Sequence, residues 1–206
     1  MQRIGVLVSG GGTNLQAILD AQENGVVRSG RVCCVISNNS RAFALERAKK
    51  YNIPAFFVSR KEQGENFENE ILRILKENEI DVVVLAGFMC ILGDTLIKAY
   101  PNKIVNVHPA LIPSFCGEGF YGLHVHEKAL EYGVKITGAT VHFVNEIADG
   151  GPIIMQMPVK IEEWDTPETL QKRVMVEAEH IILPQSVELL CAGKLDVEGR
   201  TVKIKN

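Results

Sequence analysis

Short apolar runs alternate with segments of helical period along the first half of the chain. The runs are rich in β-branched residues and predict strands over 4–8, 31–36, 55–58, 81–86 and 104–107. Between them apolar residues recur every three or four positions, which predicts helices; such sets are Leu15, Ile18 and Leu19, and Phe67, Ile71, Ile74 and Leu75, with further helices over 42–51 and 94–99. The strands over 4–8 and 82–85 are apolar on both faces, so we expect them at the centre of a sheet covered by helices.

The pattern changes after residue 134. Two alternating stretches, 137–143 and 152–159, flank a turn at Asp149, Gly150 and Gly151, which predicts an antiparallel strand pair. Thr166 and Pro167 then open a long helix, which we expect Pro184 to kink or interrupt. The alternating residues over 194–203 predict a terminal hairpin. The predicted fold is α/β: one domain over 1–206 with a doubly wound, mostly parallel Rossmann-like sheet, helices on both faces and an antiparallel strand pair towards the C-terminal part.

Composition and charge narrow the classes of function. The 206 residues include 46% hydrophobic and 23% charged side chains, as in ordinary globular domains. A net charge of −3 offers no broad basic surface to nucleic acid or anionic lipid, and no apolar stretch approaches the roughly 18 residues of a membrane span. The five cysteines lack C-x-x-C spacing, and the first residues lack the longer apolar core of a secretory signal. We therefore expect a cytoplasmic monomer or homodimer with reduced thiols that binds small molecules.

The first candidate site is the glycine-rich loop 9–14, Ser-Gly-Gly-Gly-Thr-Asn, between the first strand and the first helix. Glycines let backbone N–H groups approach an anion, and the helix N-terminus adds positive potential. The alternative interpretation is a tight turn with Thr13 or Asn14 as helix cap. A dinucleotide fingerprint is excluded because Leu15 stands at its third glycine position, and no Gly-Lys-Ser/Thr triplet marks a P-loop. The loop suits a single phosphate on a small substrate.

The second candidate site combines Asn106 and His108 with Asp149. Strand alternation places Asn106 and His108 on the same side at the C-terminal end of a strand, where open α/β sheets bind ligands. An amide can donate to a developing oxyanion, and an imidazole can exchange protons near neutral pH. An Asp beside the His would raise the pKa of the imidazole above about 6.5. In the competing interpretation, Asn106 is a buried polar residue with its hydrogen bonds satisfied, His108 caps the end of the strand, and Asp149 is a turn residue.

Three further groups are weaker candidates. His124 and His126 lack the companion ligands of a metal site, which favours a solvated loop, and we expect no metal. Cys116 lies near His108 in the sequence, although nothing around it predicts a lowered thiol pKa. His142, on a strand, is expected to pack or to support His108 rather than to react.

Four ordered motifs resemble the phosphoribosylglycinamide formyltransferase family over residues 3 to about 190. They are 8–15 (VSGGGTNL), 86–89 (AGFM), 106–115 (NVHPALIPSF) and 149–154 (DGGPII). The resemblance implies the formyltransferase fold and 10-formyltetrahydrofolate as co-substrate. It also implies site residues: Asn106, His108 and Asp149 as catalytic; Gly12, Thr13, Asn14 and Glu179 for the ribonucleotide; Met89, Cys90, Ile91, Leu92, Asn106 and Val144 for the folate.

The chain departs from the family pattern at three positions. Cys90 replaces an Arg common in the family's folate pocket, Gly64 falls roughly where the family often has another Arg, and Val176 stands where a polar residue often accompanies the Glu. These changes should weaken contacts to the folate tail or the phosphate and leave the reaction centre intact. The glycine-rich segment 116–122 is expected to be a mobile substrate loop.

The resemblance implies attack by the glycinamide amine on the formyl carbon. Asn106 and a protonated His108 would stabilise the tetrahedral oxyanion, and Asp149 would keep His108 charged. Three alternatives stay open: a 10-formyltetrahydrofolate hydrolase, another formyl-folate-dependent transferase such as a methionyl-tRNA formyltransferase, and a non-catalytic phosphosugar-binding module.

Overall fold

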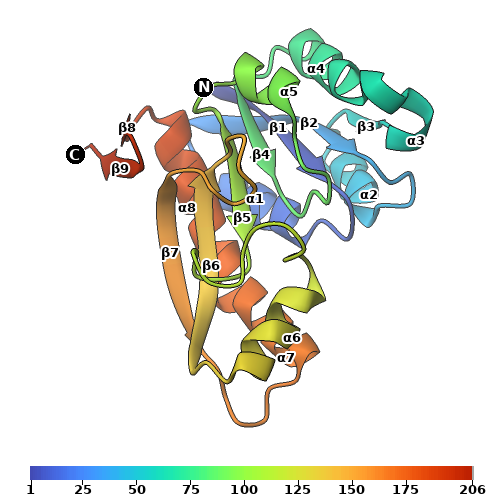
Figure 1. The fold of residues 1–206 in the computed structure, drawn as a ribbon. Helices are drawn as coiled ribbons and strands as arrows, with labels where there is room; N and C mark the ends of the chain where they lie inside the picture. The colour runs from blue at the N-terminus through green and yellow to red at the C-terminus, as the bar shows by residue number, and fades with distance from the viewer. Residues whose placement is uncertain (206) are drawn as a thin grey trace.

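The computed structural model describes residues 1–205, in which nine strands form one sheet (Figure 1). The sheet order is β3-β2-β1-β4-β5-β6-β7-β9-β8. The strands are β1 (Gln2–Val8), β2 (Gly30–Ser37), β3 (Ala55–Phe57), β4 (Val82–Leu85), β5 (Ile104–His108), β6 (Ile136–Phe143), β7 (Ile153–Lys160), β8 (Leu195–Glu198) and β9 (Thr201–Ile204). The first five are mutually parallel, whereas β6 pairs antiparallel with both β5 and β7. The predicted fold class, the antiparallel pair and the terminal hairpin are confirmed.

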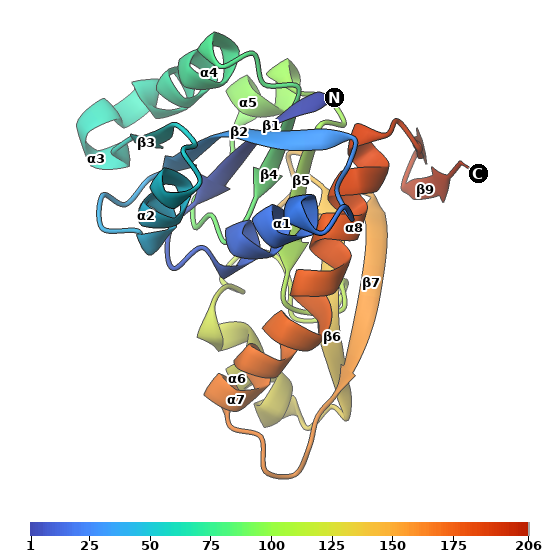
Figure 2. The ribbon, with the colours of Figure 1, turned by 180° about the vertical axis from the view of Figure 1, so that it is seen from behind.

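Helices connect these strands and lie on both faces of the sheet. They are α1 (Thr13–Glu23), α2 (Phe43–Lys50), α3 (Arg60–Gln63), α4 (Phe67–Glu77), α5 (Asp94–Ala99), α6 (Leu123–Tyr132), α7 (Pro167–Val174) and α8 (His180–Cys191), with a 3-10 turn η1 (Gly64–Asn66) and a π-helical turn η2 (Met175–Glu179). Seen from behind, α1, α2 and α8 lie in front of the sheet (Figure 2), while α4 and α5 lie on the opposite face. In the described chain no helix is both long and apolar enough to cross a membrane.

Strand alternation divides the core into two layers. On β1 the even-numbered side chains Ile4, Val6 and Val8 pack with α1, α2 and α8, and Leu7 packs with α4 and α5 on the other face. The side chains of β4 divide between the layers in the same way. Both strands lie in the interior of the sheet, side by side, as their apolar sequences predict.

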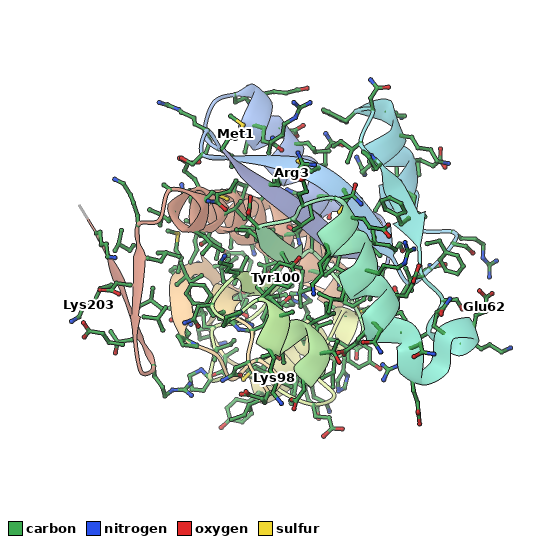
Figure 3. The ribbon with its side chains drawn as sticks, turned by 90° about the horizontal axis from the view of Figure 1, so that it is seen from above. Met1, Arg3, Glu62, Lys98, Tyr100 and Lys203 are labelled. Atoms are coloured by element: carbon green, nitrogen blue, oxygen red, sulfur yellow. The ribbon has the colours of Figure 1, made fainter. Side chains whose placement is uncertain are left out.

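Charged side chains surround this core. In the view from above (Figure 3), Glu62, Lys98 and Lys203 lie at the periphery, whereas Tyr100 lies in the interior. Tyr100 follows α5 and packs with the cluster beneath α4. The structure thus separates a water-facing rim from a two-layered apolar centre, which holds the strand ends rigidly.

Two local predictions were wrong. The helix after Thr166 runs through Pro184 inside α8, and its irregularity lies earlier, at η2, where the His180 N–H bonds to the Met175 carbonyl five residues back. The region around His124 and His126, interpreted as a solvated loop, forms α6, and His126 is fully buried. Burial of Val125 and Ala129 on the same face stabilises this short helix against the body of the protein.

We predict that Gly5→Ala destabilises the protein. A Cβ at Gly5 would lie 2.7 Å from Leu75 Cδ2 and 3.1 Å from Ile80 Cγ2, so α4 could not approach β1 as closely. Such overpacking costs about 1–3 kcal/mol, measurable as a lower midpoint of urea unfolding. Gly10→Ala is the matched control because a Cβ there meets nothing within 4 Å. Equal midpoints for the two variants would contradict this packing argument.

Candidate active site

The carboxyl ends of β1, β4 and β5 open into a cavity of about 690 Å³. In open α/β sheets this edge is where ligands bind, because the loops after the strands diverge there. All of the site residues predicted from the sequence line this cavity; they are Gly12, Thr13, Asn14, Met89, Cys90, Ile91, Leu92, Asn106, His108, Val144, Asp149 and Glu179. Gly64, Cys116 and Val176 are not among its lining residues.

The floor of the cavity is formed where β5 pairs with β6. Asn106 and His108 point to the same side of β5, and the antiparallel register places His142 opposite Asn106. The Asn106 Nδ2 atom lies 3.3 Å from His142 Nε2, and His142 Nδ1 donates to the Phe143 carbonyl at 2.8 Å. His142 Nε2 therefore accepts from the amide of Asn106, which orients that side chain.

Asp149 reaches this floor from the loop between β6 and β7. Its φ of 52° lies in the left-handed region, and Gly151 lets the loop close, because a Cβ there would lie 1.7 Å from the Phe143 carbonyl oxygen. The carboxylate lies 3.5 Å from both His108 Nδ1 and His142 Nε2, and it accepts the Gly117 N–H at 2.9 Å. The fold thus brings Asp149 to Asn106 and His108, although 41 positions separate it from His108 in the sequence.

The protonation states differ from the prediction. We expected Asp149 to raise the pKa of His108 above its ordinary value, and this was wrong. Burial of the imidazole lowers the pKa of His108, and the nearby Asp149 charge offsets this only partly. The neighbouring His108 and His142 help to lower the pKa of Asp149 despite its own burial. Near pH 7 the site therefore rests with a neutral His108 beside an ionised Asp149.

The hydrogen bonds also assign the tautomer of His108. Its Nε2 atom lies 2.8 Å from the Phe115 carbonyl oxygen, which can only accept, so Nε2 carries the proton. The unprotonated Nδ1 faces Asp149. The negative charge of Asp149 would stabilise a proton on Nδ1. This nitrogen can therefore act as a base, because its protonated form has a stabilising partner beside it.

The glycine loop forms the second wall. Gly12, at φ 72°, is the N-cap of α1, and a Cβ there would lie 2.6 Å from Ala44 Cβ. The alternative interpretation, in which Thr13 or Asn14 caps the helix, does not hold, since no side chain forms a capping hydrogen bond. The first N–H groups of α1 have no acceptor among residues 1–205. Together with the helix dipole, these donors form an anion site built from backbone.

Asn14 and Glu179 form a buried pair behind this loop. The Asn14 Nδ2 atom donates to Glu179 Oε2 at 2.6 Å, and Glu179 is only 8% exposed. The π-helical turn η2 carries both Glu179 and Met175, whose sulfur accepts from the Thr13 hydroxyl at 3.1 Å. Burial raises the pKa of Glu179, and the Asn14 bond offsets this only partly. The extra residue of the π turn thus directs a carboxylate towards the glycine loop.

The third wall follows β4. Met89 and Ile91 are 56% and 64% exposed, whereas Leu92 is 6% exposed and packs in the core with α4 and α5. The Cys90 sulfur accepts from Asn38 Nδ2 at 3.1 Å, and Val144 closes the wall from the end of β6. Met89 and Ile91 are therefore the apolar surface available to a flat ligand, and Leu92 supports them from behind.

The weaker candidates Cys116, His124 and His126 lie in surroundings that do not favour a nucleophile or a metal site. Burial and the Asp149 charge raise the pKa of the Cys116 thiol, which disfavours a nucleophile. Burial lowers the pKa of His126 to about 4, and His124 pairs with Glu127 on the surface at 3.1 Å. Within residues 1–205 no three His, Cys, Asp or Glu side chains gather as a metal site requires.

Sequence reasoning missed the backbone contacts around Asp149 and His108. The Phe115 carbonyl and the Gly117 N–H leave no signal in side-chain type; Phe115 is the last residue of the His motif, and Gly117 belongs to the glycine-rich segment 116–122 that follows it. His142, expected to pack or to support His108, is buried, and its Nε2 atom lies beside Asn106 and Asp149. The alternation of Thr140 and His142 along β6 was the signal available, because it places them on the Asn106 side.

We predict that Glu179→Gln stabilises the protein at pH 7.5. The pKa of this carboxyl is higher in the folded protein than in the unfolded chain, so ionisation above that pKa costs stability. Gln does not ionise, and its amide oxygen can still accept from Asn14. The melting temperature should exceed that of the parent at pH 7.5, and the difference should shrink on acidification.

The exposed Glu163→Gln variant is the control and should show no such trend. A Glu179→Gln protein that melts lower than the parent at pH 7.5 would show that the ionised carboxylate stabilises the fold.

Comparison with known proteins assigns the family. The formyl transferase family model matches residues 2–187. The phosphoribosylglycinamide formyltransferase of Haemophilus influenzae is 39% identical over 197 residues, covering 95% of this chain and 90% of that protein. The human trifunctional purine biosynthetic protein adenosine-3 is 40% identical over 204 residues, but this chain spans only 19% of its length.

A solved structure agrees with this assignment. The glycinamide ribonucleotide transformylase 1 of Symbiobacterium toebii superposes with a TM-score of 0.93 and 42% identity, over 100% of this chain and 95% of that one. A family model that covers most of the chain and a relative of nearly the same length, matched almost end to end, lead to one conclusion. The chain belongs to the formyl transferase family.

Proposed function

We propose that the protein transfers the formyl group of 10-formyltetrahydrofolate to the amine of glycinamide ribonucleotide, giving formylglycinamide ribonucleotide and tetrahydrofolate in purine biosynthesis. One observation carries the proposal: a single cavity holds a backbone anion site, an apolar wall and, between them, Asn106, His108 and Asp149. The activity named for the Haemophilus influenzae relative supports it.

Each substrate has a complementary wall. The ribonucleotide phosphate would accept from the N–H groups of Gly12, Thr13 and Asn14, and the Glu179 carboxylate would accept from hydroxyl groups of the same substrate. The pterin, a flat heteroaromatic ring system with a polar edge, would lay its face against Met89, Ile91 and Val144. This arrangement directs the amine of one substrate and the formyl carbon of the other towards Asn106 and His108.

The proposed chemistry follows from the protonation states of His108 and Asp149 before the substrates react. The amine attacks the formyl carbon, and the carbonyl oxygen becomes an oxyanion that accepts from the second N–H of Asn106 Nδ2. Neutral His108 takes the proton of the attacking nitrogen at Nδ1, where Asp149 stabilises the imidazolium, and returns it to the leaving folate nitrogen. No covalent enzyme intermediate and no metal is needed, and holding two substrates together supplies much of the acceleration.

The alternatives leave parts of the cavity without a purpose. A hydrolase that uses water as the acceptor would not need the anion site at Gly12 or the buried Glu179. A tRNA-acting transferase would need a basic surface, and the net charge of this chain is −3. A phosphosugar-binding module would leave the contact between Asp149 and His108 unused.

The test is to incubate the protein with 10-formyltetrahydrofolate, with and without glycinamide ribonucleotide, and to follow the folate absorbance. We expect turnover only when both substrates are present, and mass spectrometry should show the formylated ribonucleotide. Equal turnover without the ribonucleotide would identify a hydrolase instead. Phosphate-free glycinamide riboside as acceptor is the control for the anion site, and its KM should be much higher.

We predict that Asp149→Asn separates charge from shape at the reaction centre. Removing the negative charge should lower the pKa of His108 further, because the Asp149 charge now raises it. Turnover should fall about 10²- to 10⁴-fold with little change in KM, since the lost interaction forms with the imidazolium during reaction. Histidine NMR titration and steady-state kinetics measure the two effects.

The double variant Asp149→Asn/His108→Ala should lose less than the product of the two single losses, as residues acting as one unit do. Full turnover in Asp149→Asn would exclude the proposed role of the carboxylate.

A further inference from the structure

One short turn of backbone holds both titratable groups of the reaction centre. The Phe115 carbonyl accepts from His108 Nε2 at 2.8 Å, and the Gly117 N–H donates to Asp149 Oδ2 at 2.9 Å. Only Cys116 separates the two contacts, so a displacement of this turn would affect His108 and Asp149 together. The turn therefore controls the tautomer of the base and the orientation of its charged partner.

The backbone of this turn is not in a relaxed conformation. Phe115 has a φ of 48°, in the left-handed region that a bulky residue with a Cβ rarely adopts. Such a conformation persists only where surrounding contacts over-determine it. The contacts here are aromatic: the Phe115 ring meets Phe120 at a centroid distance of 6.4 Å and Tyr132 at 6.0 Å, both edge to face.

Tyr132 supplies the contact from outside the loop. It is the last residue of α6, a helix fixed by the buried side chains of Val125, His126 and Ala129, and its own side chain is 80% exposed. From the end of this anchored helix, the Tyr132 ring packs edge to face on Phe115 from outside the loop. Neither Tyr132 nor Phe115 lines the cavity, so neither touches substrate in the proposed binding mode.

We propose that Tyr132 is a positioning residue for the reaction centre. Its ring holds Phe115 in place, and through the Phe115 carbonyl and the Gly117 N–H it keeps His108 in the Nε2–H tautomer with Nδ1 towards Asp149. The catalytic consequence rests on the function proposed above, whereas the structural consequence, the tautomer of His108, does not. The two are therefore measured separately.

The kinetic experiment compares three variants of the full chain. Tyr132→Ala removes the ring, Tyr132→Phe keeps the ring without the hydroxyl, and Glu131→Ala is the matched control, because Glu131 is its exposed neighbour on α6 and pairs with Lys128 on the same helix. We expect kcat of Tyr132→Ala to fall about three- to tenfold, the factor expected for one aromatic edge contact. KM for both substrates should stay within about twofold, because the cavity walls are untouched. Tyr132→Phe should restore kcat, and Glu131→Ala should not change it.

A second variant tests the route through Phe115. Phe115→Leu keeps an apolar side chain but removes the aromatic edge, so it should lower kcat by a similar factor. The double variant Phe115→Leu/Tyr132→Ala should be no slower than the slower single variant, since both remove one contact. Multiplicative losses would show that Tyr132 acts by another route and would overturn the proposal.

Nitrogen-15 NMR of the histidine rings provides the readout that does not depend on activity. In the parent His108 should show one protonated nitrogen, Nε2, and in Tyr132→Ala it should show a mixture of tautomers. Tyr132→Phe and Glu131→Ala should match the parent. An unchanged His108 signal in Tyr132→Ala, or a loss of kcat equal to that of Glu131→Ala, would overturn the proposal. If the parent lacked formyl transfer altogether, the tautomer result would still decide the structural part.

Discussion

The antiparallel register between β5 and β6 is the constraint on which the proposed reaction centre depends. It pairs Asn106 with His142 and His108 with Thr140, so polar side chains from two strands share one face above the cavity floor. Strand side chains alternate, and a slip by one residue would turn Asn106 and His108 towards the apolar layer. The return of β7 along β6 then brings Asp149 back to the same place. The change from parallel to antiparallel pairing at this point allows three separate segments to meet.

The two buried carboxyl groups at the ends of the cavity, Asp149 and Glu179, have pKa values shifted in opposite directions because their partners differ. Asp149 has two histidines and a backbone N–H as partners, so its pKa is lowered despite burial. Glu179 has Asn14 as its hydrogen-bond partner, and its pKa is raised. Burial lowers the pKa of His108 more than the Asp149 charge raises it, so the imidazole is neutral near pH 7. A neutral base beside an ionised carboxylate is suited to proton transfer, whereas Glu179 is suited to bind hydroxyl donors.

The sequence predicted those features whose signal is local. Apolar alternation in β1 and β4 placed these strands in the interior, and the motifs at Asn106, His108 and Asp149 marked the residues that the fold brings together. It could not predict the pKa of His108, because the cost of burial depends on atoms from every surrounding segment. It also missed the π turn at η2, since one extra residue in a helix changes no residue type. The backbone hydrogen bonds of Phe115 and Gly117 could not be predicted either, because they do not depend on residue type.

Hydrogen bonds at Ser9 join the glycine loop to the loop that carries the apolar wall. The Ser9 N–H donates to the Gly87 carbonyl at 3.1 Å, and the Ser9 hydroxyl accepts from the Met89 N–H at 2.8 Å. The loop after β1, which carries the anion site, is thus bonded to the loop after β4, which carries the apolar wall, and the two strands are themselves paired. An acceptor held by one wall and a donor held by the other would meet at a separation set by the sheet rather than by flexible side chains. Because holding two substrates at a fixed separation supplies much of the advantage of a two-substrate enzyme, the short link at Ser9 would, under the proposed function, contribute to catalysis without touching the reacting atoms.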